Sequence, residues 1–365
     1  MPNNIPNTME AVLLTGHGGL EKLEYRFDVA VPTPAVNEVL IRVAAADINN
    51  TDINTRTAWY SKSVTSDTNA VGESGFESVD DTDGSWSGVP LAFPRIQGAD
   101  CCGIIAAVGE NVIAGRIGER VMVRPIQATA ADLATGNFDC RTYGSECDGG
   151  FAQYAIAFSA DALSVQSDMS DVELASFPCA YTTAEGMLDI ASIGAESVLV
   201  TGASGGVGSA AVQLAKCRGA TVIAMASSSK AADKVIDRDS DIVVALGESS
   251  IDVVVDLVAG SQWPHLLDVL KRGDRYVTAG AIAGPIVELD VRTLYLKDLS
   301  LFGSTFQDAG IFEKIIAYIE RKEIRPVVAK SYPLKDIAQA QQDFLSKKYT
   351  GKLVLVLPQA VTNEN

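Results

Sequence analysis

The feature that most constrains this chain is an apolar strand that runs into a glycine-rich turn and continues as a helix. Strand and turn read Val-Leu-Val-Thr-Gly-Ala-Ser-Gly-Gly-Val-Gly over 198–208, and a helical pattern follows over 209–216. Gly205 lets the backbone approach a pyrophosphate, and Gly208 lets the helix pack closely on the strand. The free N–H groups and the positive end of the helix attract the anion. The sequence therefore predicts a dinucleotide cradle formed by Ala203, Ser204, Gly205, Gly206, Val207 and Gly208, as AxGxxG rather than GxGxxG.

The second strand of this unit, expected over 221–226, indicates which dinucleotide is preferred. NAD sites place an Asp or Glu about twenty residues after the glycine motif, where it holds the ribose hydroxyls. Here Ala226 is followed by three serines and Lys230. A carboxylate would repel a 2′-phosphate, whereas hydroxyls and an ammonium attract it, so the sequence favours NADP(H) over NAD(H). The serines are also suited to capping the next helix, and the two roles are compatible.

Composition limits the class of protein. With 365 residues, 47% of them hydrophobic and 21% charged, the chain is a globular protein long enough for two domains. It has no apolar run of membrane-spanning length and no signal-peptide pattern at 1–8, so we expect a cytoplasmic enzyme that does not bind a membrane. The formal charge of −17 argues against binding of nucleic acid.

The order of the expected elements predicts an α/β protein in which a β-rich part precedes a nucleotide fold. Strands are expected over 10–14, 38–44, 103–108, 120–123 and 150–157, with a polar, acidic segment at 61–88 that we expect to be a surface loop. Two interpretations of this loop remain open, a lid or binding loop and a solvated insertion. Strands at 197–200, 221–226, 252–256, 274–279 and 299–303 alternate with helices, which predicts a parallel, doubly wound sheet.

Four motifs resemble the medium-chain dehydrogenase/reductase superfamily: Asn37-Glu-Val-Leu-Ile-Arg-Val43, Ala44 to Asp52, Asp148-Gly-Gly-Phe-Ala-Gln-Tyr154 and Thr201 to Gly208. The last is similar to the quinone oxidoreductase-like branch. The resemblance implies a GroES-like catalytic domain at 1–168 that includes the 61–88 loop, a Rossmann domain at 169–308 and a C-terminal return to the first domain at 309–365.

The resemblance also shows a departure that concerns zinc. By resemblance, zinc-dependent members bind the catalytic metal through a Cys, a His-Glu pair and a second Cys, and these positions correspond here to Asn49, Ala99-Asp100 and Cys179. Of those ligands only one thiolate remains. The region of the structural zinc lobe offers only Cys140 and Cys147, and the chain has just two histidines, His17 and His265. Tetrahedral zinc needs four ligands, so no metal site is predicted. In a chain of this length without an export signal, the six cysteines are expected to be reduced thiols.

Without a metal, hydrogen-bond donors must stabilise charge on the substrate oxygen. By resemblance the candidates are Asn49 at a former ligand position, Thr51 at the family's proton-relay position, and Tyr60 near the substrate pocket. This set suits hydride addition to the β-carbon of an enone, with a proton supplied by Tyr60 or water. For Asn49 and Tyr60 a role as cleft lining stays open, and Asp52 is expected to cap a helix or orient its neighbours.

The resemblance assigns the remaining cofactor contacts. Thr183 is expected at the nicotinamide end, Gly205 to Val207 at the pyrophosphate, and Ser227 with Lys230 at the 2′-phosphate. The backbone of Gly280, Ala281 and Ile282 follows a strand at the carboxyl edge of the sheet and is expected to hold the carboxamide. Lys352 is expected either to reach a phosphate or to be solvated.

The segment over 294–303 looks like the edge strand that pairs two subunits in this family. An exposed apolar edge favours association, so we expect a homodimer. The leading function is a zinc-independent, NADPH-dependent reductase of quinones or activated alkenes, with a small carbonyl or quinone substrate. Two alternatives remain: an alcohol or aldehyde oxidoreductase that either lacks a metal or recruits one through Asp100 and Cys179, and a non-catalytic NADPH-binding protein.

Overall fold

The computed structural model describes residues 5–76, 79, 82, 84–88, 90–127, 141–226 and 231–359. Its contacts divide the chain into two compact units. Unit 1 comprises Met1–Val64, Val71–Cys179 and Arg325–Asn365, and unit 2 comprises Thr65–Ala70 and Ala180–Ile324. These limits differ from the boundaries expected at 168 and 308. Helix α9 (Ala309–Glu320), expected in the C-terminal return, belongs to unit 2.

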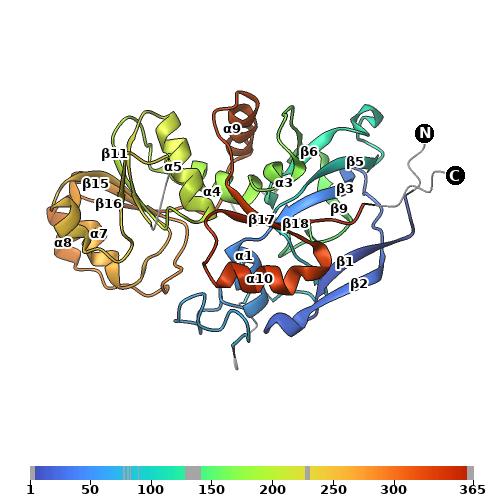
Figure 1. The fold of residues 1–365 in the computed structure, drawn as a ribbon, viewed down its shortest axis with the longest axis horizontal. Helices are drawn as coiled ribbons and strands as arrows, with labels where there is room; N and C mark the ends of the chain where they lie inside the picture. Colours follow the sequence, from blue (N-terminus) through green and yellow to red (C-terminus); the bar gives the residue numbers. More distant parts are fainter. Residues whose placement is uncertain are drawn as a thin grey trace. The chain divides into compact units, whose positions relative to one another are not determined.

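Unit 1 is built on a seven-stranded, largely antiparallel sheet in the order β10-β6-β5-β3-β18-β17, with β9 also paired to β3 (Figure 1). Pairing of β3 with β18 brings Asp47 beside Val354, although the two residues are far apart in the sequence. The strands of this sheet are β3 (Glu38–Asp47), β5 (Cys102–Val108), β6 (Arg120–Val123), β9 (Tyr154–Phe158), β10 (Ala162–Ser164), β17 (Val328–Pro333) and β18 (Lys352–Val356).

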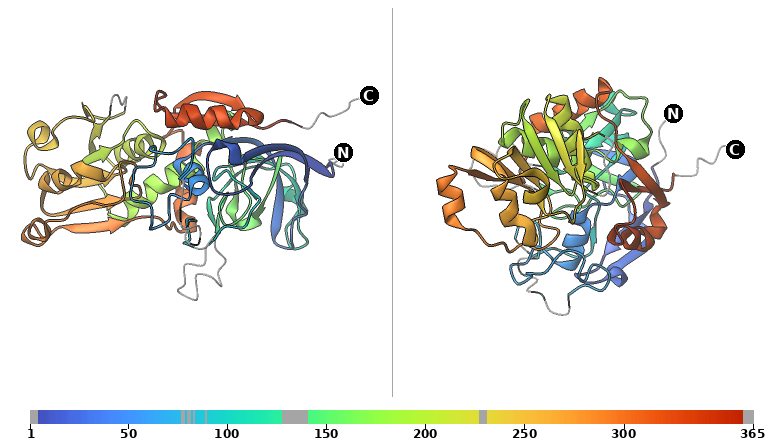
Figure 2. Two further views of the ribbon diagram at one scale, coloured as in Figure 1. Left: turned by 90° about the horizontal axis from the view of Figure 1, so that it is seen from below. Right: turned by 60° about the vertical axis from the view of Figure 1, so that its left-hand side comes forward.

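Smaller elements complete unit 1. Helix α10 (Ile337–Leu345) packs against β17 and β18 (Figure 2). The other elements are β1 (Thr8–Leu14), β2 (Leu23–Ala30), β4 (Arg95–Ile96), β7 (Ile126–Gln127), β8 (Arg141–Thr142), α1 (Asn50–Thr57) and α3 (Asp171–Leu174).

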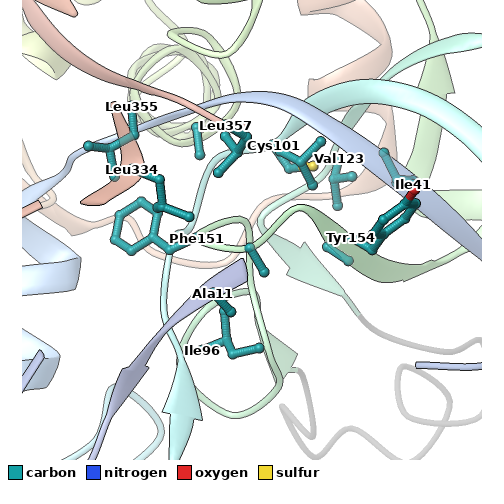
Figure 3. Close-up of a cluster of buried hydrophobic side chains, with 14 of the residues drawn as sticks. Ala11, Ile41, Ile96, Cys101, Val123, Phe151, Tyr154, Leu334, Leu355 and Leu357 are labelled. Atoms are coloured by element: carbon teal, nitrogen blue, oxygen red, sulfur yellow. The ribbon is translucent and has the colours of Figure 1, made fainter. Parts of the chain in front are cut away.

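The core of unit 1 is one cluster of buried apolar side chains drawn from several of its strands. Ile41, Phe151 and Leu355, from three distant parts of the chain, are fully buried in one apolar cluster (Figure 3). Each buried aliphatic or aromatic side chain contributes about 1.5–3 kcal/mol by leaving water. This core fixes the ends of β3 and β18, which carry the polar residues described below.

Unit 2 contains a six-stranded sheet in the order β13-β12-β11-β14-β15-β16, and all its strand pairs are parallel. The order reverses between β11 and β14, and right-handed crossovers in the two directions place the connecting helices on opposite faces. The predicted doubly wound sheet is therefore confirmed. Its strands are β11 (Ser197–Thr201), β12 (Thr221–Met225), β13 (Lys234–Ile236), β14 (Ile251–Asp256), β15 (Leu270–Thr278) and β16 (Ser300–Gly303), and its helices are α4 (Pro178–Ile190, which begins in unit 1), α5 (Gly206–Cys217), α6 (Ile242–Leu246), α7 (Trp263–Asp268), α8 (Val291–Leu296) and α9.

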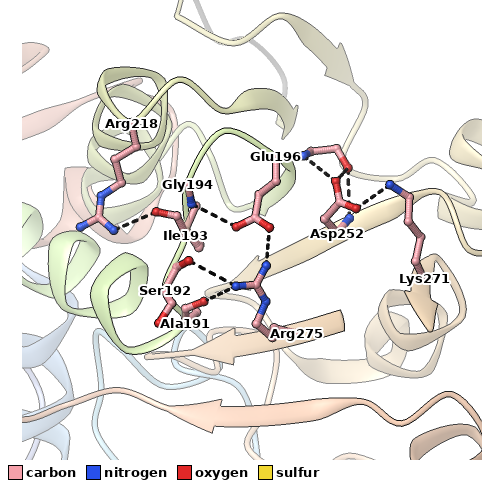
Figure 4. A network of polar contacts seen from close by, with 10 residues as sticks. Ala191, Ser192, Ile193, Gly194, Glu196, Arg218, Asp252, Lys271 and Arg275 are labelled. Atoms are coloured by element: carbon pink, nitrogen blue, oxygen red, sulfur yellow. Dashed lines mark hydrogen bonds and ion pairs between the residues drawn. The ribbon is translucent and has the colours of Figure 1, made fainter. Parts of the chain in front are cut away.

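A polar network holds the amino ends of the strands of unit 2 (Figure 4). Asp252 accepts hydrogen bonds from the Ser197 hydroxyl at 2.5 Å and from the Lys271 ammonium at 2.5 Å. Arg275 pairs with Glu196 and also donates to the Ala191 carbonyl at 2.8 Å. This network leaves the opposite, carboxyl edge of the sheet to the loops that are predicted to bind the cofactor.

Two local expectations need correction. Residues 294–296 are not in an edge strand, because they form the end of helix α8, and the edge strand β16 covers only Ser300–Gly303. The polar 61–88 segment is not wholly at the surface, since Ser61, Thr68 and Ser85 are at least 94% buried. Across the part of the chain that the structure describes, no helix is both long and apolar enough to cross a membrane.

Candidate functional site

The glycine-rich turn of unit 2 has the geometry that the sequence motif predicts. Strand β11 ends at Thr201, and α5 begins at Gly206 after Gly202 takes a φ of +58°. A Cβ on Gly208 would lie 2.2 Å from the Gly202 carbonyl oxygen, so only glycine fits there without a backbone shift. A Cβ on Gly205 would meet the same oxygen at 3.3 Å, and Gly205 is exposed. Packing requires Gly208, whereas Gly205 leaves open space above the first-turn N–H groups of α5, which lack intrahelical partners.

Asp256 holds the next loop along the carboxyl edge. Its carboxylate accepts the Thr201 hydroxyl at 2.5 Å and the Tyr276 hydroxyl at 2.6 Å, which joins the ends of β11, β14 and β15. It also accepts the backbone N–H groups of Val258 at 3.0 Å and Ala259 at 3.1 Å. Sequence analysis did not single out Asp256, although a charged residue that ends an apolar strand was a signal for it.

The loop of Gly280, Ala281 and Ile282 lies beside this turn. The N–H of Ala283 donates to the Val258 carbonyl at 2.9 Å, and the Ile282 carbonyl accepts the N–H of Thr68 at 3.2 Å. Since β11 and β15 both flank β14, their parallel order brings the 280–282 loop to the same sheet edge as the turn at 203–208. Thr183, on α4, accepts a 3.4 Å hydrogen bond from Gln307. Ser227 and Lys230 lie outside the described residues.

Unit 1 contains a second candidate region, a buried polar cluster of Asp47, Asn49, Asp52, Asp100, Cys179 and Lys352. Asn49 lies at its centre and is 6% exposed. Its amide Nδ2 donates to Asp100 at 2.7 Å, and its Oδ1 accepts the Lys352 ammonium at 2.8 Å. Lys352 also forms an ion pair with Asp47, and Asp100 accepts the N–H of Cys179 at 2.6 Å. The amide of Asn49 is therefore held between a cation and an anion.

Asp52 joins the start of helix α1 to this cluster. It accepts the Asn49 N–H at 2.8 Å and the Ala99 N–H at 3.2 Å, which is the capping and orienting role expected from the sequence. Burial raises the pKa of Asp52 to about 7, and the nearby Asp100 adds to this effect. Asp52 is therefore able to exchange a proton near neutral pH.

The close packing of charged groups in the polar cluster shifts the pKa values of its members. Burial raises the pKa of Asp47, Asp100 and Cys179. Burial alone would lower the pKa of Lys352, but the charges of Asp47 and Asp100 outweigh it and leave that pKa above its ordinary value. Lys352 is thus the cation around which the acidic groups gather.

The two hydroxyl groups predicted to act in catalysis are also brought together. Thr51 lies in the first turn of helix α1, and Tyr60 lies just after the end of the helix. The Tyr60 hydroxyl donates a hydrogen bond to the Thr51 Oγ1 at 3.0 Å. Burial raises the pKa of Tyr60 to about 12, so the phenol keeps its proton at neutral pH. Asn49, Thr51 and Tyr60 therefore occupy the start of α1, its first turn and the segment after it.

The donor set of the polar cluster does not fit a catalytic zinc. Among the described residues, no three His, Cys, Asp or Glu side chains are placed to hold a metal ion. Asn49 directs its amide hydrogen, not an acceptor, at Asp100, and the Lys352 ammonium lies against the same amide. A divalent cation would have to displace these bonds and approach a positive charge, and zinc prefers four N, S or O ligands.

One of the two expectations for Lys352, a solvated side chain, is wrong, because the residue is only 5% exposed. Its phosphate-binding role stays a prediction, although Asp47 and Asn49 already engage its ammonium. Sequence analysis missed Asp47, and the signal for it was an acidic residue after the apolar run Val43-Ala-Ala-Ala.

Comparisons with known proteins match both units. Residues 35–167 match the alcohol dehydrogenase GroES-like domain family, and residues 231–355 match the zinc-binding dehydrogenase family. The chain is 30% identical to the quinone oxidoreductase of Lama guanicoe, over 96% of this chain and 98% of that protein. A Sinorhizobium meliloti 1021 protein, provisionally described as an alcohol dehydrogenase, is 46% identical with a TM-score of 0.84 and 98% of each chain covered. An NAD-dependent alcohol dehydrogenase is 27% identical with a TM-score of 0.82, over 96% of this chain and all of that one.

A GroES-like part joined to a Rossmann fold that binds a nicotinamide cofactor defines an oxidoreductase of the medium-chain dehydrogenase/reductase superfamily. The glycine motif of 201–208 and the full-length match to quinone oxidoreductases narrow this further. The chain belongs to the quinone oxidoreductase-like branch of that superfamily.

Proposed function

We propose that this chain is a zinc-independent, NADPH-dependent reductase of quinones or α,β-unsaturated carbonyl compounds. The observation that carries the proposal is the amide of Asn49 held between the Lys352 ammonium and the Asp100 carboxyl. This arrangement fixes a neutral hydrogen-bond donor in a buried place where zinc-dependent relatives carry a metal ligand. Preorganised donors of this kind stabilise oxygen charge that develops during reaction.

Asn49 has a second amide hydrogen that its bond to Asp100 does not use. The ammonium of Lys352 withdraws charge through the Asn49 Oδ1, which strengthens both N–H groups of the amide as donors. We assign the second hydrogen to the substrate carbonyl oxygen. The Asp100 carboxyl accepts from Nδ2 and the Lys352 ammonium donates to Oδ1, so the two groups together fix the orientation of the Asn49 amide.

Proton delivery is assigned to Tyr60. When bound, NADPH would supply a hydride to the β-carbon of the substrate, and the electron pair of the C=C bond would move to the carbonyl oxygen as an enolate. Tyr60 keeps its proton at neutral pH and is able to release it to the enolate. Thr51, hydrogen-bonded to Tyr60, then passes its hydroxyl proton to the phenolate and takes another from solvent water.

A second candidate function is oxidoreduction of an alcohol or aldehyde with a recruited metal. Two observations favour it: the Sinorhizobium meliloti neighbour is provisionally described as an alcohol dehydrogenase, and the Asp100 carboxyl lies next to Cys179, whose backbone N–H donates to it at 2.6 Å. A non-catalytic NADPH-binding protein is the third interpretation, because the fold alone does not prove chemistry.

The deciding experiment measures NADPH and NADH oxidation by metal-stripped protein. The panel holds a quinone, an α,β-unsaturated ketone and an aldehyde, with zinc added back in parallel. We expect turnover of the quinone or enone with NADPH and no gain from zinc. Asn49→Ala and Tyr60→Phe should lower kcat about 10²-fold or more while the Kd of NADPH stays the same. Activity only with the aldehyde and only after zinc addition would support the metal-assisted alcohol or aldehyde oxidoreductase. Tight binding of NADPH without turnover of any substrate would support the non-catalytic NADPH-binding protein.

The preference for NADPH is proposed from the Ser-Ser-Ser-Lys sequence at 227–230 and the absence of an acidic residue there. A charge-assisted hydrogen bond from Lys230 to a 2′-phosphate would contribute about 1.5–3 kcal/mol. Lys230→Ala should therefore raise the Kd of NADPH at least tenfold and leave the Kd of NADH unchanged. An equal rise for both cofactors would contradict the phosphate assignment.

We also propose a homodimer that uses the edge of unit 2. Strand β16 ends the six-stranded sheet, and apolar side chains near it are exposed, among them Tyr295 at 58% and Leu296 at 63%. Pairing of β16 with its copy would satisfy the edge and cover these side chains.

A further inference from the structure

The 61–88 insertion contributes a short segment to unit 2. Residues 65–70 group with unit 2 by their contacts, whereas the residues on either side group with unit 1. The N–H of Thr68 donates to the Ile282 carbonyl at 3.2 Å. The insertion is therefore attached to the loop that follows β15, the loop expected to hold the carboxamide of the cofactor.

This segment has a defined conformation. The Asp67 carboxylate accepts the N–H groups of Asn69 at 2.8 Å and Ala70 at 2.9 Å, which is an Asx-type turn. Thr65 lies near the same loop. A Cβ added to Gly284 would lie 3.9 Å from the Thr65 carbonyl oxygen. The segment is thus folded around the Asp67 side chain, and its first residue lies near the loop at Gly284.

The hydroxyl of Thr68 is the feature that calls for a ligand. The residue is 6% exposed, and its Oγ1 has no hydrogen-bond partner among the residues that the structure describes. An unsatisfied buried hydroxyl costs about 1–3 kcal/mol, and buried polar groups of folded proteins are nearly always paired. The nearby Ile282 carbonyl already accepts the Thr68 N–H.

We propose that the Thr68 hydroxyl hydrogen-bonds the carboxamide of the bound nicotinamide. A hydroxyl donates and accepts, so it matches either the C=O or the NH₂ of a primary amide. Its attachment to Ile282 places it on the loop whose backbone is assigned to the same carboxamide. Residues 65–70 of the acidic insertion are then part of the cofactor site. This inference rests on the cofactor assignment within the proposed function, but not on the substrate.

The test compares ligands that differ only in the nicotinamide. Calorimetry would give the Kd of NADPH and of 2′-phospho-ADP-ribose for the wild type, Thr68→Val and Thr68→Ser, with NADH and ADP-ribose in parallel. We expect Thr68→Val to weaken the dinucleotides about tenfold, as for one lost hydrogen bond, and to leave the ADP-ribose compounds unchanged. Thr68→Ser keeps the hydroxyl and should restore the wild-type ratio.

Thr142→Val is the matched control. Thr142 is 5% exposed, and its Oγ1 likewise lacks a partner among the described residues. It lies in unit 1, whereas the loop assigned to the carboxamide lies in unit 2. This control variant should change neither Kd. Equal losses for both ligand types, an unchanged dinucleotide Kd in Thr68→Val, or a loss in Thr68→Ser as large as in Thr68→Val would overturn the proposal. If Thr68→Val does not fold, Thr68→Ala gives the same comparison. A wild type that binds NADPH but reduces none of the panel would refute the proposed function and leave this binding test intact.

Discussion

The two candidate regions are built from different parts of the polypeptide. The cradle of unit 2, residues 201–208, uses backbone N–H groups and small side chains that are consecutive in the sequence. The polar cluster of unit 1 uses side chains from four separate stretches, at 47–52, 99–100, 179 and 352. A backbone site is specified by local spacing, whereas a side-chain site is specified by the topology that brings distant strands together.

The same difference determines how each region can fail. The cradle depends on close packing, so an added methyl group is the sharpest perturbation. The polar cluster depends on compensated charge in a buried place, and removal of one partner leaves the other without solvent or counter-ion.

Lys352→Met should destabilise the protein by about 3–5 kcal/mol, because it leaves the fully buried Asp47 without its cation. Urea unfolding followed by circular dichroism gives the free energy of unfolding. The matched control is Lys330→Met, since Lys330 pairs with Asp343 at 3.0 Å but its side chain is 41% exposed. The control should change stability by no more than about 1 kcal/mol.

A second variant tests whether the loss comes from charge. Adding Asp47→Asn to Lys352→Met removes the uncompensated carboxylate, so the double variant should recover part of the lost stability. Equal destabilisation by Lys352→Met and Lys330→Met would mean that the buried ion pair contributes no more to stability than an exposed one. The polar cluster would then not depend on compensated buried charge.

Gly208→Ala should destabilise the protein by about 1–3 kcal/mol, because the new methyl would lie 2.2 Å from the Gly202 carbonyl oxygen. The shift of the turn that relieves this contact should also weaken cofactor binding at least tenfold. Thermal unfolding and fluorescence titration with NADPH measure the two effects. Gly310→Ala, near the start of α9 with nothing within 4 Å of a built Cβ, should be neutral or stabilising.

Gly205→Ala separates packing from ligand approach within the same turn. Its Cβ would meet the Gly202 oxygen at 3.3 Å, so the fold should tolerate it better than Gly208→Ala while NADPH binding still falls. Full NADPH affinity in Gly205→Ala would show that the pyrophosphate does not approach this position.

The contrast between the regions also explains which features the sequence predicted. The parallel sheet and the turn at 203–208 follow from apolar strands and a glycine spacing that can be recognised in one stretch of chain. Asn49 was predicted only through resemblance, and neither its partner Lys352 nor Asp47, which pairs with that lysine, was linked to it. Their contact depends on the pairing of β3 with β18, and no local pattern encodes that register. Thr68 illustrates the same limit, because polar composition indicated a surface loop although tertiary contacts bury the residue.

The smallest effect, counted per pH unit, is expected in the pH dependence of stability. Asp52 has a pKa of about 7 in the folded protein, raised above its ordinary value by burial. Between about pH 4 and pH 7 the unfolded chain loses this proton while the folded chain keeps it, so stability falls as pH rises. One such group contributes a slope of at most about 1.4 kcal/mol per pH unit. Asp52→Asn should flatten the curve of unfolding free energy in this window, as measured by urea titrations at successive pH values.

The groups around Asp52 define what remains of the slope in that variant. Burial also raises the pKa of Asp47 and Asp100, so Asp52→Asn should retain a shallower fall rather than a level curve. Asp343 gives the control of opposite sign, because its hydrogen bonds to Tyr332 and Lys330 lower its pKa and its contribution is lost as pH falls. Asp343→Asn should therefore reduce the acid-side loss below about pH 4 and leave the slope above it unchanged. A slope between pH 4 and pH 7 that is the same in the wild type and in Asp52→Asn would show that Asp52 is ionised throughout, and the acidic groups of the polar cluster would then carry more negative charge than one lysine balances.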